Sequence, residues 1–467
     1  MPVGIRWGDD EKNGGVRRAI RGVGRGLDRY FNITRRGSTP GREVVAGLTT
    51  FGAVAYIMAV NPAILSMAGL DHHDMIMTTI AASVCGTLLM ALMANLPIAL
   101  APAMSSNIIF AQVVVMHMGV SAAVAFAMVF LGGIVFVLLA LTSWRQKIID
   151  GFPDPVVCGI RCAIGAFIVR IGMTTSGLLV PSHDGFAFGL LRQPAVELAL
   201  GGLALAMVLS YLRVPAAMLL SIIVTSCAGL FVHGPDGRLL TRLPAHVSDW
   251  PHYPYHLLFA FDFHGLFANI LVLFPVTLYF FLSDFFDATG TMMAVTQRAT
   301  QGRDGPPLPL GRSAFCADGA ASVIGAILGT STVSAYLESL VGVEAGGRTG
   351  LCAMVVAALF ALSSFFWPLI TAIPAVATGP VLIVVGVGML STLASPQTHG
   401  LDDLASPLLM VVITLMTGNF MLALACGLLL HTLLLVGRRQ WRRLTPMLVG
   451  LDIVFVVFLY LESGMQG

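Results

Sequence analysis

The sequence predicts an all-α polytopic membrane protein with about 14 transmembrane segments, built as a 7+7 inverted repeat. Three observations predict this class. Of the 467 residues, 57% are hydrophobic and only 11% are charged, whereas a soluble domain carries about 25% charged residues. Apolar runs long enough to span a bilayer recur along the whole chain. Several motifs also recur in the same order in the two halves of the chain.

The chain opens with a basic segment, residues 1–42, which holds ten Lys and Arg against four Asp and Glu. Positively charged loops stay on the cytoplasmic side, so we interpret this segment as a cytoplasmic arm of a cell inner or plasma membrane protein. With that orientation the later basic loop residues are also cytoplasmic, namely Arg145, Lys147, Arg213, Arg298, Arg303, Arg312 and Arg348. The net charge of +2 is too small to indicate a nucleic-acid partner.

Apolar runs of spanning length follow this arm. They are 44–66, 76–98, 120–142, 155–173, 195–212, 215–233, 265–285, 313–328, 349–372, 375–395 and 445–462. Two shorter, more polar stretches, 99–118 and 329–346, lie between them. The run 406–436 is too long for one span and is interrupted at Gly418, so we interpret it as a pair of short helices. The last run either spans the membrane or lies along its surface.

Internal symmetry is the third observation. The matching pairs are "PVVCG" (155–159) with "PAVATG" (374–379), "TTFGAVAY" (49–56) with "DATGTMMA" (287–294), and the two short polar stretches. Their offsets, about 220 to 240 residues, indicate two related halves of about seven segments. An odd number of segments gives the halves opposite orientations. Inverted repeats are typical of secondary transporters, which bind substrate near the midplane where helices are interrupted.

The two short polar stretches have the composition of such interrupted helices. The stretch "LPIALAPAMSSNIIFA" (96–111) and the stretch "ILGTSTVSAYLESLVG" (327–342) each predict a short extended strand followed by a half-length helix. Backbone of this kind is tolerated at membrane depth only where protein or a watery cavity satisfies its polar groups. The two half-helices, in segments 3 and 10, are therefore expected to frame a polar pocket.

Acidic residues in apolar runs are candidates for this pocket, because a charge at the bilayer centre costs at least about 2.5–3.5 kcal/mol. Asp287 is followed by Gly290, which allows close approach of a ligand, and by Thr291, one turn along on the same face. Glu338 lies in its own apolar run. A planar heterocycle needs such acceptors for its ring N–H groups. Removal from water favours the neutral form of an acid, so these groups are also candidate proton carriers.

Plainer structural roles suit several other polar residues. Asp284 is expected to cap a helix, to pair with a cation or to face the cytoplasmic vestibule, and a direct role as a ligand is the alternative. Arg161 and Arg170 are expected near the ends of their segment, with their charges reaching the membrane surface. Cys158 is expected to be a small packing residue. His72 and its neighbour His73 are expected to be loop histidines.

Five ordered motifs carry a family resemblance: "STPGREVVAGLTTFGAVAYIMAVNPAIL", "SDFFDATGTM", "GTSTVSAYLES", "GVEAGGRTGL" and "PAVATGPVLIVVG". Together they resemble the nucleobase:cation symporter-2 family, in particular its adenine/guanine/hypoxanthine permease branch, over about residues 38–462. One motif departs from that branch, which reads like "PGMGLNA" where this chain has "PAMSSNI". Ala103 and Ser105 thus replace glycines, and Ser106 adds a hydroxyl, which leaves the preferred base open.

The resemblance implies a division of the chain into moving parts. These are a basic arm (1–42), a first core half with segments 1–4 (43–142), a first gate half with segments 5–7 (155–233), an extracellular or periplasmic loop (234–264), a second core half with segments 8–11 (265–372) and a second gate half with segments 12–14 (373–462). It also places the acid of the eighth segment on Asp287, the Glu of the tenth on Glu338 and a third-segment ligand on Asn107. A homodimer through the gate domain fits the same architecture.

The predicted function is import of a purine nucleobase (adenine, guanine or hypoxanthine) by proton symport with alternating access. The predicted substrate-binding residues are Asp287, Glu338, Asn107, Ser106, Thr332, Ser331 and Thr291, and the predicted proton-coupling residues are Asp287 and Glu338. Transport of another nucleobase, xanthine or uracil, or of a small anion on the same fold, stays open. An anion site would favour a basic residue over paired acids.

An enzyme is not predicted. The polar residues expected at membrane depth are acids, amides and hydroxyls, without a nucleophile–base pair or a cluster with metal-ligand spacing. We therefore expect no catalytic residue, no metal and no cofactor. The expected partners are the nucleobase, protons and the lipid bilayer.

Overall fold

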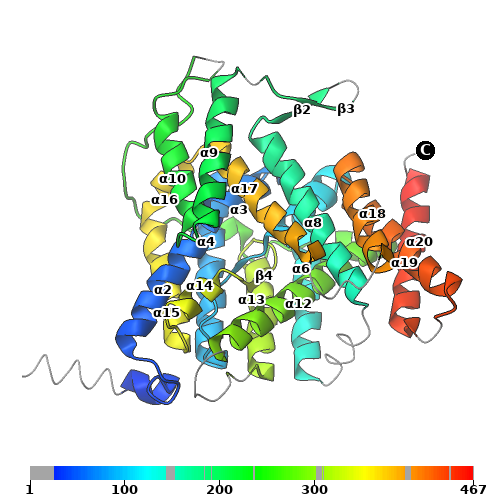
Figure 1. Cartoon of the computed structure of the whole chain (residues 1–467), viewed down its shortest axis with the longest axis horizontal. Coiled ribbons are helices and arrows are strands. Elements are labelled where there is room, and N and C mark those ends of the chain that lie inside the picture. The colour runs from blue at the N-terminus through cyan, green and yellow to red at the C-terminus, as the bar shows by residue number, and fades with distance from the viewer. Residues whose placement is uncertain are drawn as a thin grey trace, which may run out of the picture.

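The computed structural model describes residues 26–142, 153–182, 185–190, 192–234, 237–300, 308, 310–394, 401–440 and 443–465. Most of the predicted basic arm, residues 1–25, lies outside the described residues, as do Arg145, Lys147 and Arg303. The described chain is mostly helical, and its helices pack side by side around a short pair of strands, β1 and β4 (Figure 1).

The helices and strands have the following bounds. They are α2 (Pro40–Val54), α3 (Ile57–Leu65), α4 (His72–Leu89), β1 (Leu100–Pro102), α5 (Met104–Ile108), α6 (Ala122–Leu141), α8 (Asp154–Thr175), β2 (Leu179–Ser182), β3 (Gly185–Phe188), α9 (Pro194–Tyr211), α10 (Ala217–Gly229), α11 (Phe263–Ala268), α12 (Ile270–Thr300), α13 (Arg312–Ile327), β4 (Val333–Ala335), α14 (Ser339–Glu344), α15 (Gly350–Ser363), α16 (Trp367–Thr371), α17 (Ala375–Leu390), α18 (Leu401–Thr417), α19 (Phe420–Gly437) and α20 (Pro446–Met465).

Length and composition mark this as a multi-pass membrane protein. Within the described residues, eight helical segments are long and apolar enough to cross a membrane, and five shorter apolar helices accompany them. The run 406–436 is indeed a pair of helices, α18 and α19. The chain turns between them at Gly418, whose φ is +69°, and Asn419 then caps α19 by accepting a hydrogen bond from the Leu422 N–H. The number of 14 crossings remains a prediction.

The two predicted extended stretches form strands that pair with each other. β1 and β4 run antiparallel, with Leu100 opposite Ala335 and Pro102 opposite Val333. β4 lies near the middle of the molecule (Figure 1). The Ala103 N–H continues the pairing by donating to Thr332 O at 2.8 Å. Backbone groups that no water reaches thus satisfy one another across more than 200 residues of sequence.

One hydroxyl from a preceding helix supports each strand. Thr87 Oγ1 of α4 donates to Leu100 O (2.8 Å) and accepts from the Leu100 N–H (3.0 Å). Ser322 Oγ of α13 lies in the same way beside Val333, accepting from its N–H (3.1 Å) at 2.9 Å from its carbonyl oxygen. The repeated arrangement agrees with the symmetry predicted for these two segments.

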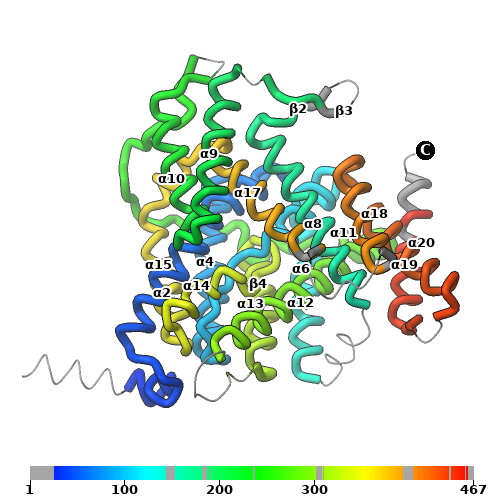
Figure 2. Tube along the Cα trace, in the orientation of Figure 1, coloured from blue at the N-terminus to red at the C-terminus, as the bar shows by residue number. Residues whose placement is uncertain are grey.

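The helix contacts form two groups. In the first, α4, α6 and α13 pack together, α15 packs on α2 and α4, and α12 and α14 contact each other beside the strands. In the second, α8 packs on α17, α18 and α19, while α9 lies against α10 and α17. Figure 2 shows the second group along one side of the molecule, with α8 next to α17.

Glycines allow α8 and α17 to approach closely. A Cβ at Gly165 would lie 2.7 Å from Gly386 O, and one at Gly386 would lie 2.5 Å from Gly165 O. Two turns along, Gly172 and Gly379 have the same reciprocal relation, at 2.7 and 2.9 Å. Small residues at these four positions let two antiparallel backbones meet, which is how helices commonly associate in membranes.

Candidate functional site

The candidate site lies where the half-helices α5 and α14 begin, beside the β1–β4 pair. Each half-helix follows its strand within a few residues, so in both halves the chain changes from extended to helical next to the β1–β4 pair. Helix α12 contacts α5, α14 and β4. Acidic residues on α12 are therefore placed next to the ends of both interrupted segments.

Asp287 of α12 is bound from two sides. Ser105 Oγ of α5 donates a hydrogen bond to Asp287 Oδ2 at 3.1 Å. Arg161 Nε of α8 lies 3.7 Å from Asp287 Oδ1, as an ion pair. The carboxylate side chain keeps 25% of its surface exposed. Asp287 is thus held in place but remains accessible, as a ligand-binding acid must be.

Glu338 lies at the start of α14 and is half-buried. Tyr56 Oη donates a hydrogen bond to Glu338 Oε1 at 2.7 Å. Within the described part of the chain no cation contacts this carboxylate. The neighbouring Tyr336 does not bind Glu338; its hydroxyl donates to Pro102 O at 2.6 Å and so fastens β4 to the end of β1.

Asn107 and Ser106 lie fully buried in α5. Asn107 Nδ2 donates to Asn61 Oδ1, and Asn61 Nδ2 in turn donates to Thr79 Oγ1 at 2.7 Å. Among the described residues, neither Asn107 Oδ1 nor the Ser106 hydroxyl has a hydrogen-bond partner. Asn61 was missed by the sequence reasoning, although an amide inside the run 44–66 was a signal for it.

Buried hydroxyls without partners also lie before β4. The hydroxyls of Thr330, Ser331 and Thr332 are all buried and, in the described chain, none has a hydrogen-bond partner. Most buried polar groups in proteins are paired, so such a cluster indicates a place for a ligand or for water. Thr291 is half-buried on α12, and among the described residues no hydrogen bond joins it to the other predicted site residues.

Two further acids lie behind the strands. Asp284 is 2% exposed and accepts a hydrogen bond from Ser322 Oγ at 2.6 Å. The sequence suggested that Asp284 caps a helix, pairs with a cation or faces a vestibule. Among the described residues it has no cation partner, and its burial rules out an open vestibule. Asp318 of α13 is fully buried and accepts from the Ala335 N–H at 2.9 Å. Sequence reasoning missed Asp318, although an acid inside the apolar run 313–328 is the signal that identified Asp287.

Both arginines of α8 donate to backbone carbonyl groups of neighbouring helices; their place at the membrane surface remains a prediction. Arg161 pairs with Asp287 and also donates from Nη2 to Phe286 O at 2.9 Å. Arg170 donates from Nη1 to Leu415 O at 3.1 Å, near the C-terminus of α18. Carbonyl groups at a helix C-terminus have no hydrogen-bond donor within the helix, so they are favourable partners for a cation. The first arginine therefore belongs to the candidate site and the second to helix packing.

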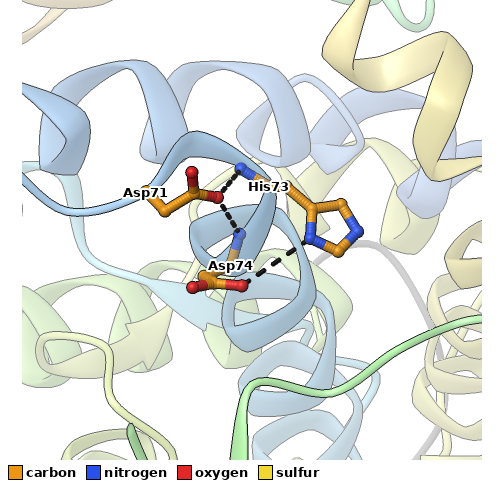
Figure 3. A group of neighbouring side chains, drawn as sticks. All are labelled: Asp71, His73 and Asp74. Carbon is orange, nitrogen blue, oxygen red and sulfur yellow. Dashed lines mark hydrogen bonds and ion pairs between the residues drawn. The ribbon is translucent and has the colours of Figure 1, made fainter. Parts of the chain in front are cut away.

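Two features lie outside this site. Asp71, His73 and Asp74 form a group whose ligand atoms lie within 4.8 Å of one another (Figure 3). Asp71 caps α4 there, since its Oδ1 accepts from the His73 and Asp74 N–H groups at 2.9 and 3.1 Å. His72 and His73 belong to the first turn of α4, not to a loop.

Separately, a cavity of about 710 Å³ is lined by residues of 238–249 and 367–374.

Comparison with known proteins places these features in context. A family model described as a permease family matches residues 41–426. The chain is 35% identical over 444 residues to the guanine/hypoxanthine permease PbuO of Bacillus subtilis, covering 92% of this chain and 100% of that protein. It is also 35% identical over 432 residues to the adenine permease AdeQ of Escherichia coli, covering 92% of this chain and 95% of that protein.

Solved structures show a similar fold. The transmembrane domain of the cyanobacterial bicarbonate transporter BicA aligns with a TM-score of 0.59 and 15% sequence identity, covering 83% of this chain and 96% of that one. The structure of SLC26A9 aligns with a TM-score of 0.58 and 12% identity, covering 94% of this chain and 73% of that one. At this level of identity the likeness extends to the fold alone.

Proposed function

This chain belongs to the nucleobase–ascorbate transporter family of permeases, and on that premise we propose that it imports a purine nucleobase by proton symport. Its family and relatives are transporters, not enzymes. The relatives are named for guanine, hypoxanthine and adenine, so these three bases are the proposed substrates. The proposed location is the cell inner membrane, with the N-terminus in the cytoplasm.

The observation that carries the proposal is the environment of Asp287. It combines an accessible carboxylate with buried, unpartnered hydroxyls on both interrupted segments, at Ser106 and at residues 330–332. A carboxylate accepts ring N–H groups strongly, and hydroxyls and amides adapt to either donors or acceptors on the base edge. We propose that Asp287 and Glu338 bind the ring, and that Ser106, Asn107 and the hydroxyls of residues 330–332 complete the pocket, with Thr291 at its edge.

Glu338 is the stronger candidate for proton coupling. The side chain that donates to it in the described part of the chain, Tyr56, is neutral, whereas Asp287 faces Arg161. An uncompensated charge at membrane depth is costly, and a proton removes that charge. We therefore propose that a proton enters with the base at Glu338, while Asp287 remains the fixed acceptor.

Movement of one helix group against the other would alternate access. We assign the first group (α2–α6 and α12–α15) to the core and the second (α8–α10 and α17–α19) to the gate, in line with the predicted division of the chain. The site lies on core elements next to the gate helix α8. Rigid-body motion of this kind is general among transporters with inverted repeats. Dimerisation through the gate group remains a prediction.

Transport of a small anion is less well supported. An anion site favours an unpaired cation, and the cation present here, Arg161, already faces a carboxylate. Repulsion from the Asp287 carboxylate would oppose an anion, whereas a neutral base with N–H donors would be attracted.

Uptake of labelled bases tests the proposal. In cells that lack their own purine permeases, we expect uptake of at least one of tritiated adenine, guanine and hypoxanthine, and at least a tenfold loss on adding an uncoupler. Glu338→Gln should abolish the uncoupler-sensitive part and Asp287→Asn should abolish uptake. Glu197→Gln, at an exposed position of α9, is the control. An uptake rate that the uncoupler does not lower would exclude proton coupling.

A further inference from the structure

The contact between Arg161 and Asp287 joins a gate helix to the site. Arg161 Nη2 donates to Phe286 O at 2.9 Å, and Arg161 Nε lies 3.7 Å from Asp287 Oδ1. The guanidinium therefore lies along α12, against a backbone carbonyl and a carboxylate that are adjacent in sequence. Its side chain is 30% exposed, so solvent or a small ligand reaches the pair.

Gly290 provides the space for this contact. A Cβ at that position would overlap Arg161 Nη2 and would lie 3.2 Å from Arg161 Cζ. From the sequence alone, Gly290 is predicted to allow close approach of a ligand. In the structure a cation from α8 fills this space, so any larger residue would displace the guanidinium from α12.

The pair has the strength of a reversible contact. At 3.7 Å the Nε–Oδ1 separation is longer than a hydrogen bond, and partly exposed ion pairs contribute little to stability. Breaking it with no replacement would leave a carboxylate uncompensated in the membrane, which is costly. The pair is therefore stable while the site is empty, and a ligand that brings its own N–H donors to Asp287 can replace it.

We propose that Arg161 is a substrate-displaced latch between gate and core. With the site empty, Arg161 occupies Asp287 and holds α8 against α12. A purine ring N–H then donates to the same carboxylate and displaces the guanidinium. With the ion pair broken, α12 is free to move relative to α8. This inference rests on the proposed function, because it takes the base as the displacing ligand.

Binding measurements on purified full-length protein test the latch. A ligand that must first open a closed state binds with an affinity reduced by the open fraction. We therefore expect Arg161→Gln to bind tritiated hypoxanthine about two- to fivefold more tightly than the unmodified protein, the range expected for a weak ion pair. Arg161→Lys keeps the charge and should lie between the two. Adenine and guanine are measured in parallel.

Arg170→Gln is the matched control, because Arg170 lies on the same helix but bonds to α18 within the gate. It should leave base affinity unchanged. Weaker binding in both Arg161→Gln and Arg161→Lys would make Arg161 a ligand of the base and overturn the latch. Unchanged affinity in Arg161→Gln would overturn it as well.

A second measurement needs no substrate and separates failure of the latch from failure of the proposed function. Without base, Arg161→Gln and Asp287→Asn should each lower the thermal unfolding midpoint, and the double variant should lower it by less than the sum of the two. Additive shifts would overturn the latch. If none of the three bases binds the unmodified protein while the shifts are non-additive, the ion pair stands and the proposed substrate is wrong.

Discussion

Individual side chains in this protein act mainly by satisfying polar groups that no water reaches. Asp318 accepts a hydrogen bond from the Ala335 N–H. Thr87 and Ser322 each contact the backbone polar groups of one strand residue, Leu100 and Val333 respectively. An unpaired buried group costs about 1–3 kcal/mol, so these contacts fix the strands at membrane depth. The hydroxyls of Ser106 and of residues 330–332 have no hydrogen-bond partner among the described residues, and we propose that they line the site.

Ser105 is the residue at which this chain departs most informatively from the permease branch that it resembles. A glycine is usual there, whereas Ser105 donates a hydrogen bond to Asp287. We expect Ser105→Ala to weaken base binding about fivefold, because a hydrogen bond that orients the carboxylate contributes about 1 kcal/mol. Equilibrium binding of tritiated hypoxanthine measures this.

The control for this change is Ser313→Ala, at an exposed position of α13, which should bind the base as the unmodified protein does. An unchanged affinity in Ser105→Ala would show that Asp287 keeps its orientation without this donor.

At the scale of elements, the half-length helices form the proposed site, whereas the close-packed helices form a tight structural pair. α5 and α14 end the extended strands and present their first residues to the site, while α8 and α17 form a tight antiparallel pair through four glycines. The pair is expected to move as one unit, because backbone contacts of this kind resist sliding.

Substitution of one of these glycines tests the helix pair. Gly386→Ala places a Cβ 2.5 Å from Gly165 O, and overpacking of this kind costs about 1–3 kcal/mol. We expect a lower thermal unfolding midpoint. Gly388→Ala, on the same helix with no atom within 4 Å, should instead raise the midpoint slightly, because Ala favours a helix by about 0.5–1 kcal/mol. Equal shifts in the two variants would argue against the close contact.

At the scale of the whole molecule, the two helix groups meet along a surface that contains the site. The core group supplies the acids and both half-helices, and the gate group supplies Arg161. Ligand binding at a site divided in this way can alter how the two groups move, since a ligand changes the contacts that join them.

The orientation of the molecule is testable with single cysteines. If the N-terminus is cytoplasmic, the loop after α10 faces outward and the C-terminal end of α12 faces inward. We expect a membrane-impermeant maleimide to label Ser248→Cys in intact cells and to label Gln297→Cys only after permeabilisation, over the background of the unmodified chain. Both positions are exposed. The reverse pattern would place the N-terminus outside.

The sequence by itself determined the class of molecule and the kind of chemistry. Apolar runs, short polar stretches and Gly418 predicted the membrane helices, the β1 and β4 strands and the α18–α19 turn, because these depend on neighbours in the chain. It also selected Asp287 and Glu338, since an acid in an apolar run is visible without a structure.

Only the tertiary structure decided which groups meet. The pairing of Arg161 with Asp287 joins residues 126 positions apart, and Asp318 acquires a role only through the N–H of Ala335 on a strand that itself pairs with β1. Such contacts follow from how helices pack and from the register of the two strands. Local composition determines neither the helix packing nor the strand register, because the same apolar faces allow several packings. A hydrogen bond between distant residues then favours one of them.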